Sequence, residues 1–500
     1  MNPFPAGGTE AAVVDGSLPS RIARASLWIG VSTVGAALSG LLRGKLLAVL
    51  VGPAGVGVVG QLSGIQQVAS IIGALGLTAA LVRVLAGRGA AGWGEEAAQL
   101  VGQTGATQLT LGLAIALGAV VAQEPLAAWA LGEPSLGWAL SLAALGLPAV
   151  LATQLLQNVA IAAGRLRRYV MATLVDAVLT TGLAIVAVVG FGLRGAVTYL
   201  LLGPLLSMIV AALAFGVVLP AGTVLELLRR TIRPDWATLR ALLSFGVAIA
   251  ITYVTRQGTV TIVRGLLFHE QGSFAVGLFQ AAYALSTYYV TFFNQPLLSI
   301  AYPELSACAD ETASRRAYEP WFELTIATVP VLLLAYVVAL PLVIPLLNSP
   351  QFAEAVPIAA WHAAGDFCFL IVALNRMRWF ASGRTGHALR LELVMDFAFI
   401  AAAWAMIGRY GAVGVALAHL WAAGLAMVGS LLADGLRRGV RLLLRAAPPL
   451  AALVLSALAM GRGGKLAFVV PLAAMVVLTG LTLSQGPRVA RWFAVVRRSR

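Results

Sequence analysis

Apolar runs of about twenty residues or more follow one another along almost the whole chain, and glycine, proline or charged residues separate them. A helix needs about 20 apolar residues to cross a membrane, where every backbone polar group must be paired inside the segment. The pattern therefore predicts an all-α polytopic membrane protein with about fourteen transmembrane helices. The predicted spans are 24–50, 54–85, 99–122, 136–163, 168–190, 194–219, 238–266, 273–301, 321–347, 355–382, 387–408, 411–434, 446–460 and 465–484.

The composition argues against a soluble protein. Of the 500 residues, 60% are hydrophobic and 11% are charged, and the mean hydropathy is +0.91. Soluble domains carry about 25% charged residues, so lipid must cover much of this surface. Residues 1–20 lack the features of a signal peptide and are predicted to form a flexible cytoplasmic tail. Cys308 and Cys368 form no disulfide or metal-binding pattern, and no metal site is predicted.

The net charge of +14 reflects basic residues gathered in alternate loops. Arginine and lysine of short loops stay on the cytoplasmic side during insertion, so both termini are predicted to be cytoplasmic and no nucleic-acid partner is needed. The short loops leave no room for a soluble catalytic domain, so a transporter is expected and not an enzyme. The basic loops contain Arg165, Arg167 and Arg168; Arg229, Arg230 and Arg233; Arg315 and Arg316; Arg384 and Arg390; and Arg437, Arg438, Arg441 and Arg445.

A short pattern occurs twice, six predicted spans apart. Arg43-Gly44 is followed by Val56-Gly57, and Arg264-Gly265 is followed by Val276-Gly277 at a spacing that differs by one residue. Parallel repeats of this kind are common in transporters. The pattern predicts two pseudo-symmetric six-helix lobes, followed by a helix pair. The predicted parts are the tail 1–20, an N-lobe 21–232, a C-lobe 233–436, and a C-terminal helix pair with a basic tail, 437–500.

Three segments resemble the Wzx-type O-antigen and lipid-linked oligosaccharide flippases of the multidrug/oligosaccharidyl-lipid/polysaccharide exporter superfamily. The segments are RASLWIGVSTVGAALSGLLRGKLLAVLVGPAGVGVVGQ (24–61), AAWHAAGDFCFLIVALNRMRWFASGRT (359–385) and YGAVGVALAHLWA (410–422). The second contains a Trp-x3-Gly-Asp core, Trp361, Gly365 and Asp366. The C-terminal helix pair departs from the twelve-helix members of the family.

The resemblance implies a V-shaped bundle with a central cavity in the bacterial inner membrane. It further implies alternating access that moves an undecaprenyl-pyrophosphate-linked glycan from the cytoplasmic to the periplasmic leaflet. The partners would be this glycan, membrane lipid and polysaccharide-assembly proteins, and a monomer is expected. The alternatives are a drug or ion antiporter of the same superfamily, a membrane glycan polymerase or ligase, and a non-transporting scaffold for glycan assembly.

Four cations within or near the spans are candidates for binding the pyrophosphate in this cavity: Arg43, Lys45, Arg256 and Arg264. A charged residue inside a membrane is costly and by default faces a cavity or a partner. The alternatives are that Arg43 and Lys45 reach the outer headgroups, that Arg256 pairs with a carboxylate such as Asp366, and that Arg264 is an ordinary anchor.

Polar uncharged residues recur at helical spacing on several spans and are candidates for the sugar-facing lining. Interhelical hydrogen bonding is the alternative. The candidates are Ser39, Gln66, Gln67, Gln154, Asn158, Gln280, Thr287, Thr291 and Asn294.

His362 and Asp366 lie four residues apart, so their side chains can meet on one helix face. The pair can carry a proton, or Asp366 can hold Na⁺, and either would couple transport to an ion gradient. The alternative is a structural role for Asp366. No cofactor beyond H⁺ or Na⁺ is expected.

Overall fold

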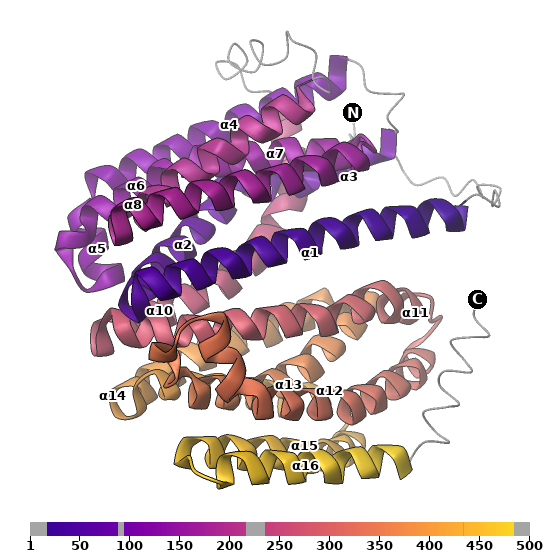
Figure 1. Cartoon of the computed structure of the whole chain (residues 1–500). Coiled ribbons are helices and arrows are strands. Elements are labelled where there is room, and N and C mark those ends of the chain that lie inside the picture. The colour runs from indigo at the N-terminus through magenta and orange to yellow at the C-terminus, as the bar shows by residue number, and fades with distance from the viewer. Residues whose placement is uncertain (1–17, 89–94, 217–235, 434, 485–500) are drawn as a thin grey trace. The chain divides into compact units, whose positions relative to one another are not determined.

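The computed structural model describes residues 18–88, 95–216, 236–433 and 435–484, and these residues form helices joined by short turns (Figure 1). Most of the predicted tail 1–20, the arginines at 229, 230 and 233, and the basic segment 485–500 lie outside the described residues.

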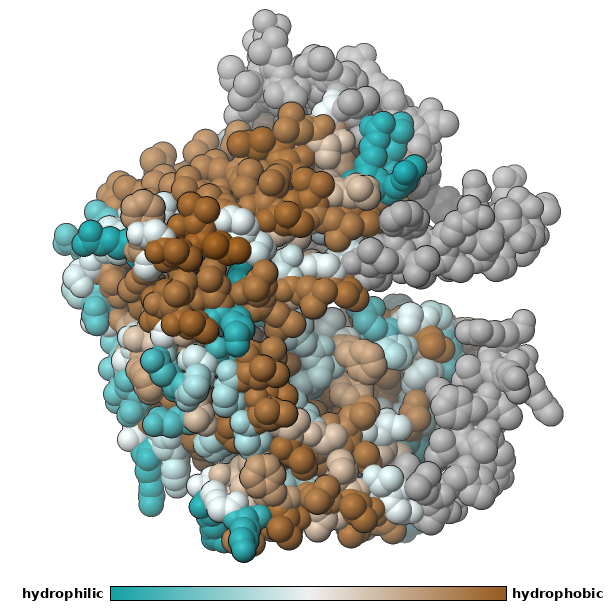
Figure 2. Space-filling model, in the orientation of Figure 1, coloured by the Kyte–Doolittle hydropathy of each residue, from teal (hydrophilic) through white to brown (hydrophobic). Residues whose placement is uncertain are grey.

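Eight helices among the described residues are long and apolar enough to cross a membrane. Hydrophobic side chains cover broad areas of the visible surface (Figure 2), and large ones such as Phe191, Leu213 and Trp404 are more than two-thirds exposed. Such exposure is unfavourable in water and is expected in lipid. The prediction of an all-α polytopic membrane protein is therefore confirmed. The spanning helices lie within Gly52–Ala74, Glu96–Val121, Pro134–Ala162, Leu166–Phe215, Glu311–Leu347, Ala355–Ala381, Thr385–Leu432 and Leu436–Arg462.

The chain divides into two compact units. The first contains Met1–Val51 and Val59–Thr261, and the second contains Gly52–Val58 and Ile262–Arg500. The predicted lobes meet at residues 232 and 233, whereas here the beginning of α10 up to Thr261 belongs to the first unit. Two helices thus contribute to both units: α2 (Gly52–Ala74) and α10 (Trp236–Pro296).

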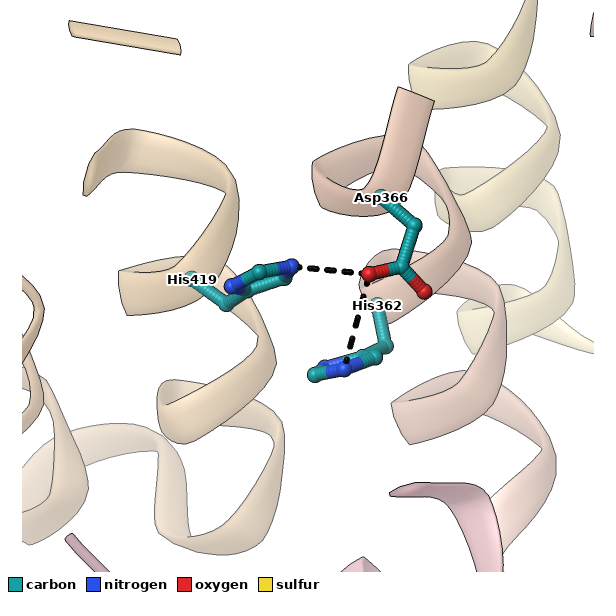
Figure 3. Close-up of side chains that lie close together, drawn as sticks. All are labelled: His362, Asp366 and His419. Atoms are coloured by element: carbon teal, nitrogen blue, oxygen red, sulfur yellow. Dashed lines mark hydrogen bonds and ion pairs between the residues drawn. The ribbon is translucent and has the colours of Figure 1, made fainter. Parts of the chain in front are cut away.

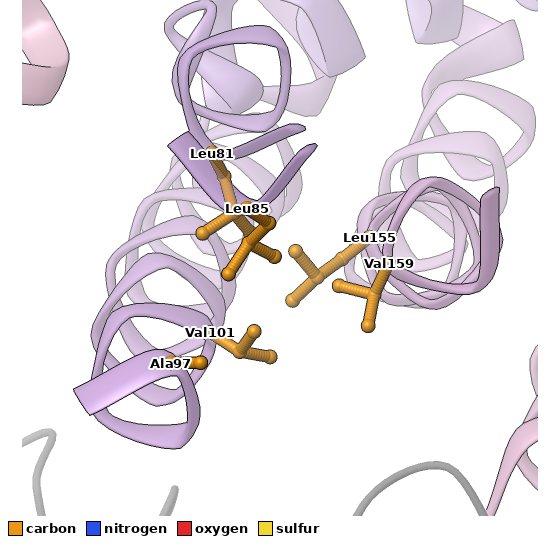
Figure 4. Close-up of a cluster of buried hydrophobic side chains, with 6 residues drawn as sticks. All are labelled: Leu81, Leu85, Ala97, Val101, Leu155 and Val159. Atoms are coloured by element: carbon orange, nitrogen blue, oxygen red, sulfur yellow. The ribbon is translucent and has the colours of Figure 1, made fainter. Parts of the chain in front are cut away.

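The first unit consists of helices that pack along their lengths, with α1 against α8 and α7 against α8. Its helices besides parts of α2 and α10 are α1 (Leu18–Leu50), α3 (Leu77–Arg88), α4 (Glu95–Val121), α5 (Gln123–Leu131), α6 (Gly137–Leu145), α7 (Leu147–Ala162) and α8 (Leu166–Phe215), with a 3-10 turn η2 (Pro134–Leu136). Aliphatic side chains of α3, α4 and α7 form one of its cores (Figure 4). The core residues are Leu81, Leu85, Ala97, Val101, Leu155 and Val159.

In the second unit, α13 packs against α14, and both contact the C-terminal pair directly or through α12. Besides its share of α2 and α10, the unit contains η3, a π-helix (Leu297–Ala301), α11 (Tyr302–Ser306), α12 (Glu311–Leu347), η4 (Pro350–Phe352), α13 (Ala355–Ala381), α14 (Thr385–Leu432), α15 (Leu436–Arg462) and α16 (Leu466–Ser484). Arg438 and Arg445 of α15 form ion pairs with Glu319 and Glu323 of α12. The predicted C-terminal helix pair is thus part of the second compact unit.

Two predicted spans are divided in the structure. The run 54–85 is split into α2 and α3 at Leu75 and Gly76, which both have positive φ. A Cβ built on Gly76 would lie 2.0 Å from the backbone oxygen of Gly246, so only glycine permits this approach. The run 136–163 is split into α6 and α7 at Gly146.

The long segments α8, α10 and α14 each consist of two helices that meet at a glycine of positive φ, at the boundary between two separately predicted spans. The glycines are Gly192 in α8, Gly272 in α10 and Gly411 in α14. Turns of this backbone conformation favour glycine, which has no Cβ to clash.

The backbone repeats itself about 220 residues apart. Six of the glycines of positive φ form pairs at separations of 219 or 220: Gly52 and Gly272, Gly164 and Gly383, and Gly192 and Gly411. The hydrogen bond from the Arg165 N–H to the Ala160 oxygen has its counterpart from Arg384 to Trp379. The repeat therefore relates α7 to α13 and α8 to α14, which supports the predicted internal repeat.

The two Val-Gly pairs, Val56-Gly57 and Val276-Gly277, lie at a reciprocal contact in the second unit. A Cβ on Gly57 would lie 2.0 Å from the backbone oxygen of Ser273, and one on Gly277 would lie 1.8 Å from that of Pro53. Gly57 and Gly277 are 220 positions apart, as are Pro53 and Ser273. Each repeat thus contributes a glycine that receives the backbone of the other.

Candidate functional site

A buried carboxylate between two histidines lies where α13 and α14 pack together in the second unit (Figure 3). The Oδ1 atom of Asp366 is 3.0 Å from Nε2 of His419 and 3.9 Å from Nε2 of His362. The two imidazole rings stack, with centroids 4.4 Å apart. Their exposed fractions are 3% for His362, 3% for Asp366 and 9% for His419.

The second oxygen of the carboxylate is also held. Ser286 and Tyr289 of α10 both donate hydrogen bonds to Oδ2 of Asp366 at 2.5 Å. Hydrogen bonds to an ionised acceptor are short and strong, and they offset part of the cost of burying a charge in apolar surroundings. Three helices therefore position this side chain.

Gly365 explains how α14 comes so close. A Cβ on Gly365 would lie 2.5 Å from Cδ2 of His419 and 3.0 Å from the backbone nitrogen of Leu420. The two residues of the Gly-Asp sequence at 365–366 thus have different roles. Gly365 allows α14 to pack closely, and Asp366 forms a hydrogen bond with His419 of α14.

Aromatic rings enclose the cluster. The rings of Phe279 and Tyr283 of α10 lie in T-shaped arrangements with His362, and that of Phe399 of α14 does so with His419. The guanidinium of Arg264 lies 4.9 Å from the centre of the Tyr283 ring, and its side chain is buried. This predicted cavity cation therefore lies beside the aromatic wall, and its role in substrate binding stays a prediction.

The cluster can carry two kinds of cation. One ligand atom from each of His362, Asp366 and His419 lies within 4.8 Å of the others, which suits a metal ion. Imidazole and carboxylate can also share a proton. His362 and Asp366 were predicted as an ion-coupling pair, and the structure adds His419 to them.

A second polar network lies in the first unit, where α1 packs on α8. Nη1 of Arg43 donates to Oγ1 of Thr180 at 2.9 Å, and Ser207 donates to the carboxylate of Asp176 at 2.7 Å. The charge of Arg43 also attracts that carboxylate. Arg43 is half-buried, and its contacts hold it within the helix bundle.

The other predicted cations differ in exposure. Lys45 is exposed on α1, and Arg256 is half-buried on the part of α10 that belongs to the first unit. Ser39 is half-buried one turn before Arg43 on α1. These placements test none of the predicted binding roles.

The two glutamines of α2 that were predicted to line the cavity, Gln66 and Gln67, differ in their surroundings. Nε2 of Gln66 donates to the backbone oxygens of Ala143 in α6 and Leu200 in α8, at 2.6 and 3.1 Å. Gln67 is exposed. Gln66 therefore ties three helices together, as the alternative of interhelical hydrogen bonding describes.

Replacing Gln66 with leucine is expected to lower the free energy of unfolding by about 1–2 kcal/mol, because two carbonyls lose a donor. Gln67→Leu is the matched control and should leave the melting temperature of the purified protein unchanged. A Gln66→Leu protein with unchanged thermal stability and lost transport would favour a sugar-lining role instead.

The remaining predicted lining residues lie on α7 and α10. Asn158 donates to the backbone oxygen of Gln154, one turn earlier. Thr287 and Thr291 are exposed, and each donates to the carbonyl four residues before it. The side-chain oxygens of Gln280 and Asn294 are buried without a hydrogen-bond donor among the described residues. The sugar-lining role of this set stays a prediction.

The candidate sites contain residues that the sequence patterns did not single out. These are His419 and Ser286 in the second unit, and Thr180 and Ser207 beside Asp176 in the first. A histidine inside an apolar span was a signal for His419, since an ionisable residue there needs a partner. Nothing in the sequence indicated which helix would supply that partner.

Comparison with known proteins adds the family. Residues 46–357, more than half of the chain, match the polysaccharide biosynthesis protein family. The Lipid III flippase of Escherichia coli (strain K12) is 25% identical over 425 residues, which cover 80% of this chain and 94% of the relative. The Lipid III flippase of Shigella flexneri matches with the same identity and coverage.

Solved structures share the fold. The Lipid II flippase MurJ in its inward closed conformation superposes with a TM-score of 0.66 at 13% identity, over 92% of this chain and 99% of that chain. An inward-facing multidrug resistance MATE family transporter of the MOP superfamily gives 0.63 at 17% identity, over 81% and 95%. The expectation of a transporter, and not an enzyme, is confirmed by these comparisons. The chain belongs to the polysaccharide biosynthesis protein family and has the fold of the MOP superfamily of transporters.

Proposed function

We propose that this protein flips an undecaprenyl-pyrophosphate-linked oligosaccharide, an O-antigen or similar surface-polysaccharide unit, from the cytoplasmic to the periplasmic leaflet. The similarity to the Lipid III flippase, which extends over 94% of that relative, carries the proposal. The family match supports the same class of substrate.

The chemistry of the described residues agrees with such a substrate. A pyrophosphate and several sugars cannot cross about 30 Å of hydrocarbon unaided, because desolvating charged and hydroxyl groups is costly. Cations in the spanning helices offset this cost. We propose that Arg43, Lys45, Arg256 and Arg264 interact with the diphosphate in a central cavity, and that the polar uncharged residues contact the sugars.

The finer architecture belongs to the same proposal. The kinked helices α8, α10 and α14 would each supply two spans, which gives about fourteen in all. The chain would lie in the bacterial inner membrane as a monomer with both termini cytoplasmic, and alternating access of an N-lobe and a C-lobe would move the substrate. His362 and Asp366 would couple this movement to H⁺ or Na⁺.

Reconstitution into liposomes with a defined undecaprenyl-pyrophosphate-linked oligosaccharide tests the proposal. The measurement is the fraction of lipid-linked glycan that becomes accessible to a glycan-binding or hydrolytic reagent outside the liposomes. We expect the glycan to become accessible faster than in protein-free liposomes. Arg43→Ala and Arg256→Ala should each reduce this rate at least about tenfold, because a hydrogen bond to a charged group contributes roughly 1.5–3 kcal/mol.

Arg194→Ala is the matched control, since this arginine is exposed, and its rate should equal that of the unchanged protein. A rate no higher than that of protein-free liposomes would overturn the flippase assignment. An antiporter of small molecules would transport its own substrate normally after loss of both arginines.

A further inference from the structure

We propose that His362, Asp366 and His419 form a binding site for a divalent transition-metal ion of the Zn²⁺ class. The site lies inside the second unit and bridges α13 and α14. An ion bound there would take the place of the H⁺ or Na⁺ proposed above for His362 and Asp366, and the test below does not require transport.

The donor set selects the class of ion. Two imidazoles and one carboxylate are ligands typical of zinc and its neighbours, and a fourth position is left for water. Na⁺ and Mg²⁺ prefer oxygen ligands, of which Asp366 supplies one carboxylate. The cluster is the group of three ligand-type side chains within 4.8 Å of one another found among the described residues.

The distances are close to those of a bound ion. A tetrahedral Zn²⁺ with bonds of about 2.0–2.1 Å places neighbouring ligand atoms about 3.3 Å apart. The observed separations from Oδ1 of Asp366 are 3.0 Å to His419 and 3.9 Å to His362. The two ring planes are 19° apart, so ion binding requires the imidazoles to turn until the in-plane lone pairs of both Nε2 atoms point at the ion.

The surroundings of the carboxylate resemble the support that metal ligands usually receive. Ligating carboxylates are commonly hydrogen-bonded through their other oxygen, which fixes their orientation. Here Ser286 and Tyr289 hold Oδ2 of Asp366, so that Oδ1 faces the histidines.

The internal repeat shows that the helix crossing does not need these residues. The counterparts of His362, Asp366 and His419, 219 positions earlier, are Ala143, Leu147 and Leu200, all buried. The crossing itself is equivalent: a Cβ on Gly146 would lie 2.5 Å from the oxygen of Leu200, as one on Gly365 would lie 2.5 Å from His419. The three ligands are thus present in the second repeat and absent from the first, although both repeats pack at this crossing. This favours a role in binding over a role in packing.

The test uses the full-length protein purified in detergent through a tag without histidines. Co²⁺ is the probe, because four-coordinate Co²⁺ has visible absorption bands that report its ligands directly, and Zn²⁺ should displace it. We expect about one Co²⁺ per chain, and a higher melting temperature with Zn²⁺ than with EDTA, because a ligand that binds only the folded state stabilises it.

Asp366→Asn and His419→Gln should each weaken Co²⁺ binding about tenfold or more. His387→Gln changes an exposed histidine of the same helix α14 and should bind like the unchanged protein. Gly365→Ala keeps all three ligands but displaces His419, and it should also weaken binding, whereas Gly424→Ala on α14, where a Cβ meets no atom within 4 Å, should not.

Three results would overturn the metal site. These are the absence of four-coordinate Co²⁺ bands, a melting temperature equal in Zn²⁺ and EDTA, or undiminished binding in Asp366→Asn and His419→Gln. A protein that binds no metal but still flips the glycan would refute this site alone, and one that binds metal without flipping would refute the flippase proposal alone.

Discussion

Replacing Gly277 with valine is expected to leave little folded protein in the membrane. A Cβ at this position would lie 1.8 Å from the backbone oxygen of Pro53, 2.6 Å from its carbonyl carbon and 3.1 Å from its Cα. These are backbone atoms of α2, so no side-chain rotation relieves the clash. Overpacking of a core usually costs about 1–3 kcal/mol, and a rigid contact of this kind should cost more.

The measurement is size-exclusion chromatography of detergent extracts, in which the fluorescence of a fused reporter protein detects the eluting protein. Gly277→Val should give an aggregated or much reduced peak. Gly258→Val on the same helix α10 is the control, because a Cβ there meets no atom within 4 Å. Gly57→Val should behave like Gly277→Val, since the contact is reciprocal, and a normal peak for both would contradict the close crossing of the two repeats.

The sequence predicted the broad architecture well because lipid imposes a simple rule. Every spanning segment must be helical and apolar, so the runs of apolar residues revealed the membrane class. The same rule placed the turns at Gly192 and Gly411, which lie at the boundaries of separately predicted spans. It did not reveal the break of the run 54–85, where Leu75 and Gly76 have positive φ and the backbone oxygen of Gly246 would lie 2.0 Å from a Cβ on Gly76.

The internal repeat was visible in the sequence as a single short match, yet the structure repeats along α7, α8, α13 and α14. The reason is that a backbone turn with positive φ favours glycine, whereas the same backbone elsewhere accepts many different residues. Gly164 and Gly383 are both followed by arginine and end their helices in the same way. Elsewhere the paired positions differ, because any apolar side chain of suitable size fills a helix interface.

The candidate site was half predictable. His362 and Asp366 share one helix face, so their proximity follows from helical spacing. His419 is 53 positions from Asp366, and only the packing of α14 against Gly365 brings them together. Likewise, the sequence placed Arg43 within a span, but its contact with Thr180 depends on how α1 packs against α8. Tertiary partners of this kind have no local signature.

Copying the first repeat into the second is expected to separate stability from function. The change combines Ser286→Gln, His362→Ala, Asp366→Leu and His419→Leu, which are the residues at Gln66, Ala143, Leu147 and Leu200 of the first repeat. In that repeat the glutamine donates to the backbone at Ala143 and Leu200. The same two bonds should form from the glutamine introduced at position 286 to the carbonyls of residues 362 and 419.

The variant should therefore fold. Replacing a buried charged cluster with well-packed apolar residues is often neutral or stabilising by about 1–4 kcal/mol, and the Tyr289 hydroxyl is the group that loses its acceptor. Thermal unfolding should show a melting temperature equal to or above that of the unchanged protein. Removing Asp366 alone, as Asp366→Leu, should instead be destabilising, because Ser286, Tyr289 and His419 would lose their shared acceptor.

Transport by the four-residue variant should fall to the level of protein-free liposomes if this cluster supplies the ion-dependent step. A stable variant with full transport would mean that the cluster serves neither coupling nor flipping. The four-residue variant could instead unfold, while Gln66→Leu shows that the glutamine stabilises the first repeat. That result would mean that the glutamine-linked crossing of the first repeat cannot replace the crossing of the second. The first repeat thus serves as the reference for the second, because its equivalent helices meet at the equivalent glycine, Gly146, without a buried charge.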